Sequence, residues 1–199
     1  MTAIPLDPIT ADNSALLLID YQPTMLQGVE SGDRASMMNA TAATAKAAAI
    51  LGVPVALSSI WNDGNGKFLP SIAEVFPDAK IHERAVPGFD ALEDETYAMA
   101  VRDTGRSKLV VSGLWTSMCM TFTTLHALAD GYEVYGLIDA AGDASAEAHE
   151  YGVQRMLQAG VVPITWMPLV SEWMHDWSNP KADRLKSDVY GAYSPLLAG

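Results

Sequence analysis

The chain has 199 residues, 49% of them hydrophobic, which fits a single domain that can bury a substantial core. Its 24 acidic and 12 basic residues give a net charge of −12 with no Lys/Arg cluster, so neither nucleic acid nor an anionic membrane is an expected partner. One cysteine excludes an intrachain disulfide framework. With no signal-peptide pattern at the start and no apolar run of about 20 residues, the sequence predicts a cytoplasmic protein.

Short apolar segments alternate with helix-favouring segments along the chain. Residues 15–19 form a continuous apolar run, which is typical of a strand buried on both faces of a parallel sheet. Further strands are expected at 53–59, 80–83, 108–112, 134–138 and 161–166. Helices are expected at 34–51, 93–104, from Cys119 to about Asp130, and at 146–159, with an irregular loop at 61–70. This alternation predicts an α/β fold in which helices cover both faces of a parallel sheet.

Three reactive residues follow three different strands of this expected sheet. Asp20 ends the first strand, Arg84 follows the third, and Cys119 lies just past the fourth. Because function in such sheets sits at the carboxyl ends of the strands, we expect the three side chains to share one edge. Thr116 or Ser117 is the expected N-cap of the helix that carries Cys119, and a helix start favours the thiolate over the thiol.

These residue types have complementary chemical roles. Asp20 could take the thiol proton and pass it to a leaving amine. Arg84 stays charged, so it could stabilise a thiolate, keep Asp20 ionised or bind an anionic substrate group. The structural alternatives are a small buried hydrophobe for Cys119, a loop cap for Asp20 and a solvated surface cation for Arg84.

Several other sites are disfavoured by the sequence. The first strand is followed by DYQPTML, which lacks a dinucleotide-binding glycine motif, and Gly64-Asn-Gly-Lys67 lacks the Walker spacing. No G-x-S-x-G serine elbow occurs. The histidines make no metal-ligand pair, and His126 and His149 are interpreted as helix-surface or interface residues; the four are His82, His126, His149 and His175. No metal or other cofactor is therefore expected.

Three segments resemble the isochorismatase-like cysteine hydrolases, and the resemblance covers about residues 12–170. They are LLLIDYQ, VVSGLWTSMCMTFTTLHALADGYEVYGLIDA and HEYGVQRMLQAGVVPITW. The G-x-x-T-x-x-C pattern from Gly113 to Cys119 is the most specific part. The run FPDAKIHER and the Trp-containing tail are similar to the YcaC-type subgroup. The resemblance implies a three-layer α/β/α fold with a six-stranded parallel sheet ordered 3-2-1-4-5-6.

The resemblance also implies roles for individual residues. Asp20 would be the general base and Cys119 the nucleophile, and Arg84 stands where most of the family has lysine. A cis peptide is implied at Leu114-Trp115, and the backbone amides of Trp115 and Cys119 would form an oxyanion hole. The metal-binding Asp-x-His pair of some family members is missing from SSIWNDGNG, and retention of the cysteine implies cleavage of a C–N bond.

Our leading hypothesis is a hydrolase that cleaves a small amide-like substrate through an acyl intermediate on Cys119. Gln22, Trp61, Phe68 and Trp115 are candidates for the pocket lining, with loop packing as the alternative. A second hypothesis is an oligomeric binding or scaffold protein with little turnover, and a third is a redox-sensing thiol. We treat residues 1–199 as one domain whose tail, about 171–199, packs on a neighbouring subunit. The resemblance implies a homo-oligomer, with an octamer as the YcaC-type expectation.

Overall fold

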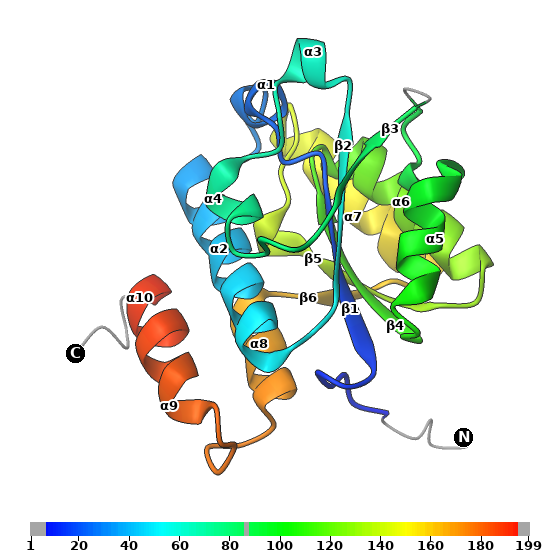
Figure 1. The fold of residues 1–199 in the computed structure, drawn as a ribbon. Helices are drawn as coiled ribbons and strands as arrows, with labels where there is room; N and C mark the ends of the chain where they lie inside the picture. Colours follow the sequence, from blue (N-terminus) through cyan, green and yellow to red (C-terminus); the bar gives the residue numbers. More distant parts are fainter. Residues whose placement is uncertain (1–6, 86–87, 195–199) are drawn as a thin grey trace.

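The computed structural model describes residues 7–85 and 88–194, and its centre is a six-stranded parallel sheet (Figure 1). The strands are β1 (Ser14–Ile19), β2 (Val55–Ile60), β3 (Ile81–Arg84), β4 (Lys108–Gly113), β5 (Glu133–Leu137) and β6 (Val162–Ile164). They are ordered β3-β2-β1-β4-β5-β6, which confirms the predicted order. All six residues of the central strand β1 are buried, as its continuous apolar run predicts.

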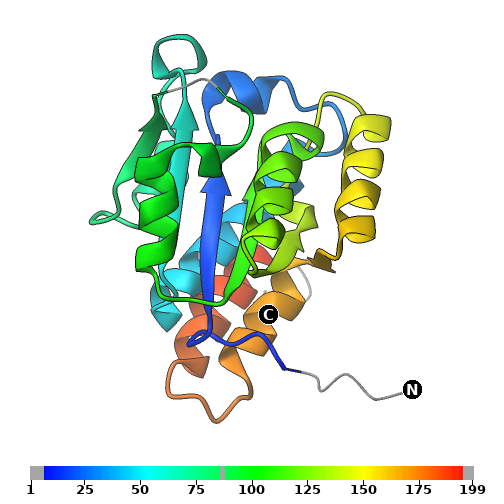
Figure 2. The same cartoon turned by 90° about the vertical axis from the view of Figure 1, so that its right-hand side faces the viewer.

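Two helical layers cover the sheet, and alternate residues of β1 pack toward opposite layers. Leu16 and Leu18 belong to the core beneath α2 (Arg34–Leu51) and α8 (Trp166–Met174). Leu17 and Ile19 belong to the core on the other face. That face is covered by α5 (Glu95–Asp103), α6 (Thr121–Ala129) and α7 (Ala146–Ala159) (Figure 2). The three-layer α/β/α architecture is therefore confirmed.

The longest helix, α2, has the bounds that the sequence predicts. Asp33 caps its first turn by accepting a hydrogen bond from the backbone N–H of Ser36. Gly52 ends it with a φ of 80°, a left-handed conformation that glycine adopts without a steric penalty. Its many alanines lie against the sheet because small side chains allow close packing.

Most predicted strands and helices differ from the structure by one or two residues at their ends, and two further differences have a clear local cause. The segment 61–70 is not wholly irregular, because α3 (Asn62–Asn65) and the start of α4 (Pro70–Ala73) form short helices there. The last strand ends at Ile164, earlier than predicted, because α8 begins at Trp166, whose backbone N–H donates to both carboxylate oxygens of Asp139. The remaining short elements are α1 (Pro23–Gln27), η1 (Ala91–Glu93), the π-helical turn η2 (Thr116–Met120) and η3 (Ile138–Ala140).

The last described segment of the chain packs beside α2. It forms α9 (Ala182–Leu185), the π-helical turn η4 (Lys186–Tyr190) and α10 (Gly191–Tyr193). Trp173 of α8 is buried, and its indole N–H donates to Ser14 Oγ at 2.8 Å. Trp166 and Trp177 both contact the ring of Tyr190. The described part of the predicted tail thus has its own packing partners within the chain.

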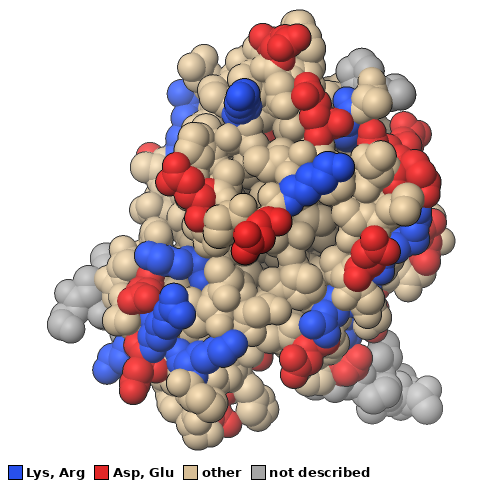
Figure 3. Space-filling view, in the orientation of Figure 1, with Lys and Arg blue, Asp and Glu red and all other residues tan. Residues whose placement is uncertain are grey.

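The surface carries charges of both signs. On the face shown in Figure 3, basic side chains gather at the lower left, near the C-terminal helices, with acidic side chains interleaved among them. The segment 181–186 contributes Lys181, Arg184 and Lys186 to the chain's basic residues. Within residues 7–85 and 88–194, no helix combines the length and the apolar character that crossing a membrane requires.

Candidate active site

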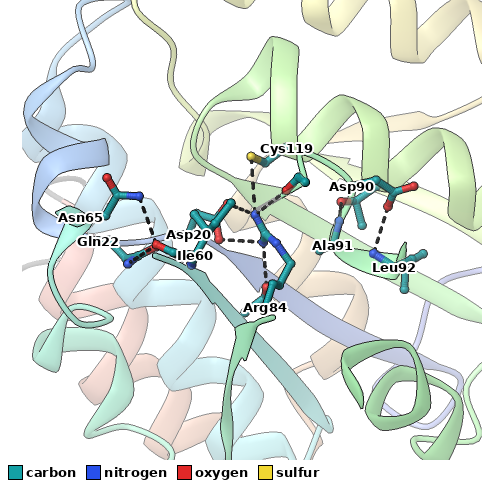
Figure 4. Close-up of polar contacts among 12 residues, drawn as sticks. Asp20, Gln22, Ile60, Asn65, Arg84, Asp90, Ala91, Leu92 and Cys119 are labelled. Atoms are coloured by element: carbon teal, nitrogen blue, oxygen red, sulfur yellow. Dashed lines mark hydrogen bonds and ion pairs between the residues drawn. The ribbon is translucent and has the colours of Figure 1, made fainter. Parts of the chain in front are cut away.

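Asp20 and Arg84 form a buried ion pair at the carboxyl edge of the sheet (Figure 4). Arg84 Nη1 donates to Asp20 Oδ1 and Arg84 Nη2 donates to Asp20 Oδ2, both at 2.8 Å. The side chains are 0% and 1% exposed for Asp20 and Arg84 respectively. This two-point geometry matches the planar guanidinium to the carboxylate, which a lysine could not do. The structural alternative of a solvated surface arginine is wrong.

The backbone explains why these two residues meet. Asp20 follows the last residue of β1, and its backbone N–H donates to Ser58 O of β2 at 2.8 Å. Its φ is 59°, a left-handed conformation that Asp tolerates better than most residues and that turns the chain sharply at the end of the strand. Arg84 is the last residue of β3 and pairs in register with Ile60. The parallel register therefore brings both residues to the same edge.

Cys119 lies beside this pair, with its Sγ 3.9 Å from Arg84 Nη2. Its residue is only 3% exposed. The predicted N-caps were wrong, because Thr116 and Ser117 already belong to η2, whose N-cap position is Trp115 without a side-chain cap. Gly113 is required before this turn, since a Cβ there would lie 2.8 Å from Ile19 Cβ. The structure thus brings Asp20, Arg84 and Cys119 together.

The charge state of the thiol differs from the prediction. Burial, together with the negative charge of Asp20, raises the pKa of Cys119 from 9.0 to about 12, although Arg84 acts in the opposite direction. Burial also raises the pKa of Asp20 against the opposing effect of Arg84. The expected thiolate at a helix start is therefore wrong for the resting protein, because burial outweighs the amides of one turn. With this pKa the thiol keeps its proton near neutral pH, and the carboxylate of Asp20 lies beside it.

The donors of Arg84 are almost all used within the protein. Beyond Asp20, Nη1 donates to Ser58 Oγ at 2.8 Å and Nη2 donates to Gly88 O at 3.2 Å. The remaining donor, Nε, is buried and has no partner among the described residues. Burial opposes the charge, but Asp20 reverses this effect and raises the pKa of Arg84. Because both Nη groups are hydrogen-bonded and Nε is buried, Arg84 can hold Asp20 in place but offers no exposed N–H group to an anionic substrate.

The residues expected to form an oxyanion hole border the same turn. The peptide bond Leu114-Trp115 is cis. The backbone N–H of Thr116, the residue after Trp115, donates to Gly142 O at 3.0 Å. The indole N–H of Trp115 donates to Met25 O at 2.9 Å, which fixes the ring beside α1.

The candidates for the pocket lining have different surroundings. Gln22 is buried and clamps the loop after β2, because its amide bonds to both the N–H and the carbonyl of Ile60 and to Gly66 O (Figure 4). Phe68 is buried edge-to-face against Tyr21. Trp61 is 64% exposed. Gln22 and Phe68 therefore make the contacts that loop packing predicts.

Other side chains near the site were not found from the sequence. Ser58 contacts Arg84, but it lies within an ordinary strand pattern and gives no local signal. Asp143 accepts from the N–H of Ser117 at 2.6 Å, although it is distant in sequence. His149, interpreted as a surface or interface residue, is half-buried with Nδ1 2.8 Å from Thr116 Oγ1. Across residues 7–85 and 88–194, no group of three or more His, Cys, Asp or Glu side chains could hold a metal ion.

The chain has a three-layer α/β fold, and an acid, a cation and a thiol meet at the carboxyl edge of its sheet. These features place it in the class of α/β proteins with a cysteine at the carboxyl edge of a parallel sheet. The isochorismatase domain model matches residues 14–167, so the chain belongs to the isochorismatase family. This confirms the resemblance predicted from the sequence.

Several proteins similar to this chain are YcaC proteins. The probable hydrolase YcaC of Escherichia coli is 29% identical over 170 residues, which are 84% of this chain and 81% of that protein. YcaC from Pseudomonas aeruginosa with hexane-2,5-diol and covalent acrylamide matches with a TM-score of 0.94 at 27% identity, over 98% of this chain and 96% of its own. The Escherichia coli YcaC structure, an octameric hydrolase of unknown specificity, matches with a TM-score of 0.93 at 26% identity, over 98% and 95% of the two chains. The chain is thus a YcaC-like hydrolase of the isochorismatase family.

Proposed function

We propose that this protein hydrolyses a C–N bond in a small, neutral amide-like substrate through a thioester intermediate on Cys119. The observation that carries the proposal is the buried Asp20–Arg84 pair with Cys119 Sγ 3.9 Å from the guanidinium. An acid–base group and a fixed cation beside a lone thiol are the parts that nucleophilic catalysis requires.

The raised thiol pKa sets the order of proton movements. Cys119 attacks the substrate carbonyl as its proton passes to Asp20, so a free thiolate need not accumulate. The backbone N–H groups of Trp115 and Cys119 hold the oxyanion of the tetrahedral intermediate. Asp20 then gives the proton to the departing amine, and the C–N bond breaks to leave the thioester.

A water molecule completes the cycle. Asp20 takes a proton from water as the oxygen attacks the thioester carbonyl, and the C–S bond breaks to release the carboxylic acid. The proton returns from Asp20 to the sulfur. Throughout these steps Arg84 keeps its charge and orients both oxygens of Asp20.

The occupied donors of Arg84 support a neutral reacting group. A substrate carboxylate placed next to the thiol would face the negative charge of Asp20 without a free guanidinium edge to bind it. An amide or carbamoyl group carries no such charge. A homo-oligomeric assembly is also part of the proposal, supported by the octameric Escherichia coli relative.

The test of the nucleophile is covalent labelling. Incubation with acrylamide or a small electrophilic aldehyde, followed by intact-mass measurement, should show one adduct in the wild type and none in Cys119→Ala. Equal labelling of Cys119→Ala would remove the proposed nucleophile. Acrylamide suits this experiment because the Pseudomonas aeruginosa relative carries it covalently.

The scaffold alternative draws support from the same Asp20–Arg84 pair, because both carboxylate oxygens are already hydrogen-bonded. A panel of small amides assayed with the wild type and Arg84→Lys separates the two functions. Wild-type turnover that falls in Arg84→Lys supports the hydrolase. Turnover that appears only in Arg84→Lys supports the scaffold, because lysine would then restore an activity that the natural residue blocks. The redox alternative is disfavoured since a buried thiol with a raised pKa reacts slowly with oxidants.

A further inference from the structure

The turn that carries Cys119 is held from outside by the segment between β5 and α7. Gly142 O accepts from the N–H of Thr116 at 3.0 Å, and the Asp143 carboxylate accepts from the N–H of Ser117 at 2.6 Å. These are the first two N–H groups of η2, which no residue within the turn can satisfy. The β5–α7 segment therefore supplies the cap that the sequence of the turn lacks.

Asp143 is itself held firmly in place. Its residue is 2% exposed, its other carboxylate oxygen accepts from the N–H of Ala144 at 2.8 Å, and its own N–H donates to Ser31 Oγ at 2.9 Å. A carboxylate bound to backbone N–H groups makes stronger hydrogen bonds than a neutral acceptor. This side chain thus fixes the position of Ser117, two residues before the nucleophile.

His149 and Gly152 extend this contact along α7, which lies beside α6 in Figure 2. His149 Nδ1 lies 2.8 Å from Thr116 Oγ1, at the start of η2. At Gly152 the helix touches the backbone of the turn, because a Cβ there would lie 2.8 Å from Ser117 Cα and 3.0 Å from Ser117 N. Glycine in the middle of a helix costs about 0.5–1 kcal/mol relative to alanine. The close approach of α7 to η2, which glycine allows, offsets this cost.

Asp143, His149 and Gly152 contact η2 without contacting the ion pair by a hydrogen bond. Among the described residues, none of the three hydrogen-bonds to Asp20, to Arg84 or to the sulfur of Cys119. Their effect on the thiol is therefore transmitted through the backbone of η2. The first two N–H groups of η2 are bound from outside the turn, so these outside contacts help to set the direction of the sulfur.

We propose that Asp143, His149 and Gly152 are positioning residues, which hold η2 so that Cys119 faces Asp20 and a bound carbonyl. This inference rests on the proposed function of Cys119. Displacing a reacting group by about 1 Å can cost on the order of 100-fold in rate, so loss of this support should slow the reaction of the thiol more than it affects binding.

The test measures the inactivation of Cys119 by acrylamide in the full-length protein, separating the maximal rate kinact from the half-saturating concentration KI. Gly152→Ala should lower kinact about tenfold or more with KI unchanged. Its matched control is Gly32→Ala, since a Cβ at Gly32 has no atom within 4 Å. A merely structural effect of Gly152→Ala would lower thermal stability and leave kinact unchanged in the protein that remains folded.

Asp143 gives a graded test that does not depend on Gly152→Ala being folded. Asp143→Ala should lower kinact most, and Asp143→Asn should recover part of it because one amide oxygen can still accept from Ser117. His149→Asn should likewise retain more activity than His149→Ala. Folding of each variant is checked by far-UV circular dichroism and thermal unfolding.

The two proposals fail in different ways. If the folded variants label as fast as the wild type, the positioning role is wrong while the nucleophile stands. If wild-type and Cys119→Ala proteins label equally, the proposed function fails first.

Discussion

Among residues 7–85 and 88–194, two Lys or Arg side chains are buried, one at each end of the sheet, and their surroundings are opposite. Lys108 starts β4, with its side chain 1% exposed, but its partners Asp7 and Glu133 are 71% and 57% exposed. Arg84 ends β3, is equally buried, and pairs with Asp20, which is 0% exposed. Water solvates the anions at one end and is excluded from the anion at the other. A buried cation alone is therefore no sign of function, whereas a buried pair beside a thiol is.

Removal of Asp20 should have the largest effect. Asp20→Ala leaves the Arg84 guanidinium buried without its counter-ion, and breaking such a pair costs about 3–5 kcal/mol of unfolding free energy. The same change removes the proposed base, so turnover of small amides should become undetectable. Urea unfolding and the small-amide assay check the two effects separately.

The double variant Asp20→Ala/Arg84→Met sharpens this prediction. It removes both charges, so most of the lost stability should return while small-amide turnover stays absent. A cost below about 1 kcal/mol in Asp20→Ala would mean that the carboxyl edge tolerates an unpaired cation as easily as a solvated surface does.

The raised pKa of Cys119 predicts an unusual pH dependence of its reactivity. In the folded protein the alkylation rate with iodoacetamide should keep rising above pH 9, because burial raises the pKa of the thiol to about 12. In the urea-unfolded chain the rate should level off near pH 9. The unfolded thiol ionises first, so the thiol's contribution to folded-state stability is complete below about pH 9 and is lost as pH rises toward 12.

The rates of alkylation by iodoacetamide are measured from pH 6 to 11 in the wild type. The same measurement in Cys119→Ser gives the background that does not come from the thiol. If the alkylation rate of the folded protein levelled off below pH 8, the predicted rise of the thiol pKa would be contradicted. Such a plateau would mean that the helix start and Arg84 outweigh burial after all.

The sequence predicts some features of the candidate site and misses those that depend on burial by distant segments. The convergence of Asp20, Arg84 and Cys119 follows from strand order, because the carboxyl ends of parallel strands meet at one edge. The pKa of Cys119 was predicted in the wrong direction, since a helix start is visible locally but burial depends on distant segments. The contact of Asp143 with Ser117 was missed for the same reason, because it joins two loops. The burial of the Lys108 side chain was missed as well, because no residue near it in sequence indicates that it is buried.

The smallest effect is expected at the other end of the sheet, in Glu133→Gln. Glu133 is 57% exposed, and Lys108 keeps Asp7 Oδ2 at 3.0 Å and Asp7 O at 3.2 Å. A solvated ion pair contributes about 0–1 kcal/mol, so the free energy of unfolding should fall by less than about 1 kcal/mol. Labelling of Cys119 should not change, because the substitution lies at the amino edge of β5. If Glu133→Gln instead cost as much as Asp20→Ala, the exposure of the anion would not be what distinguishes the two buried cations. The burial of the cation would then set the cost at both ends of the sheet.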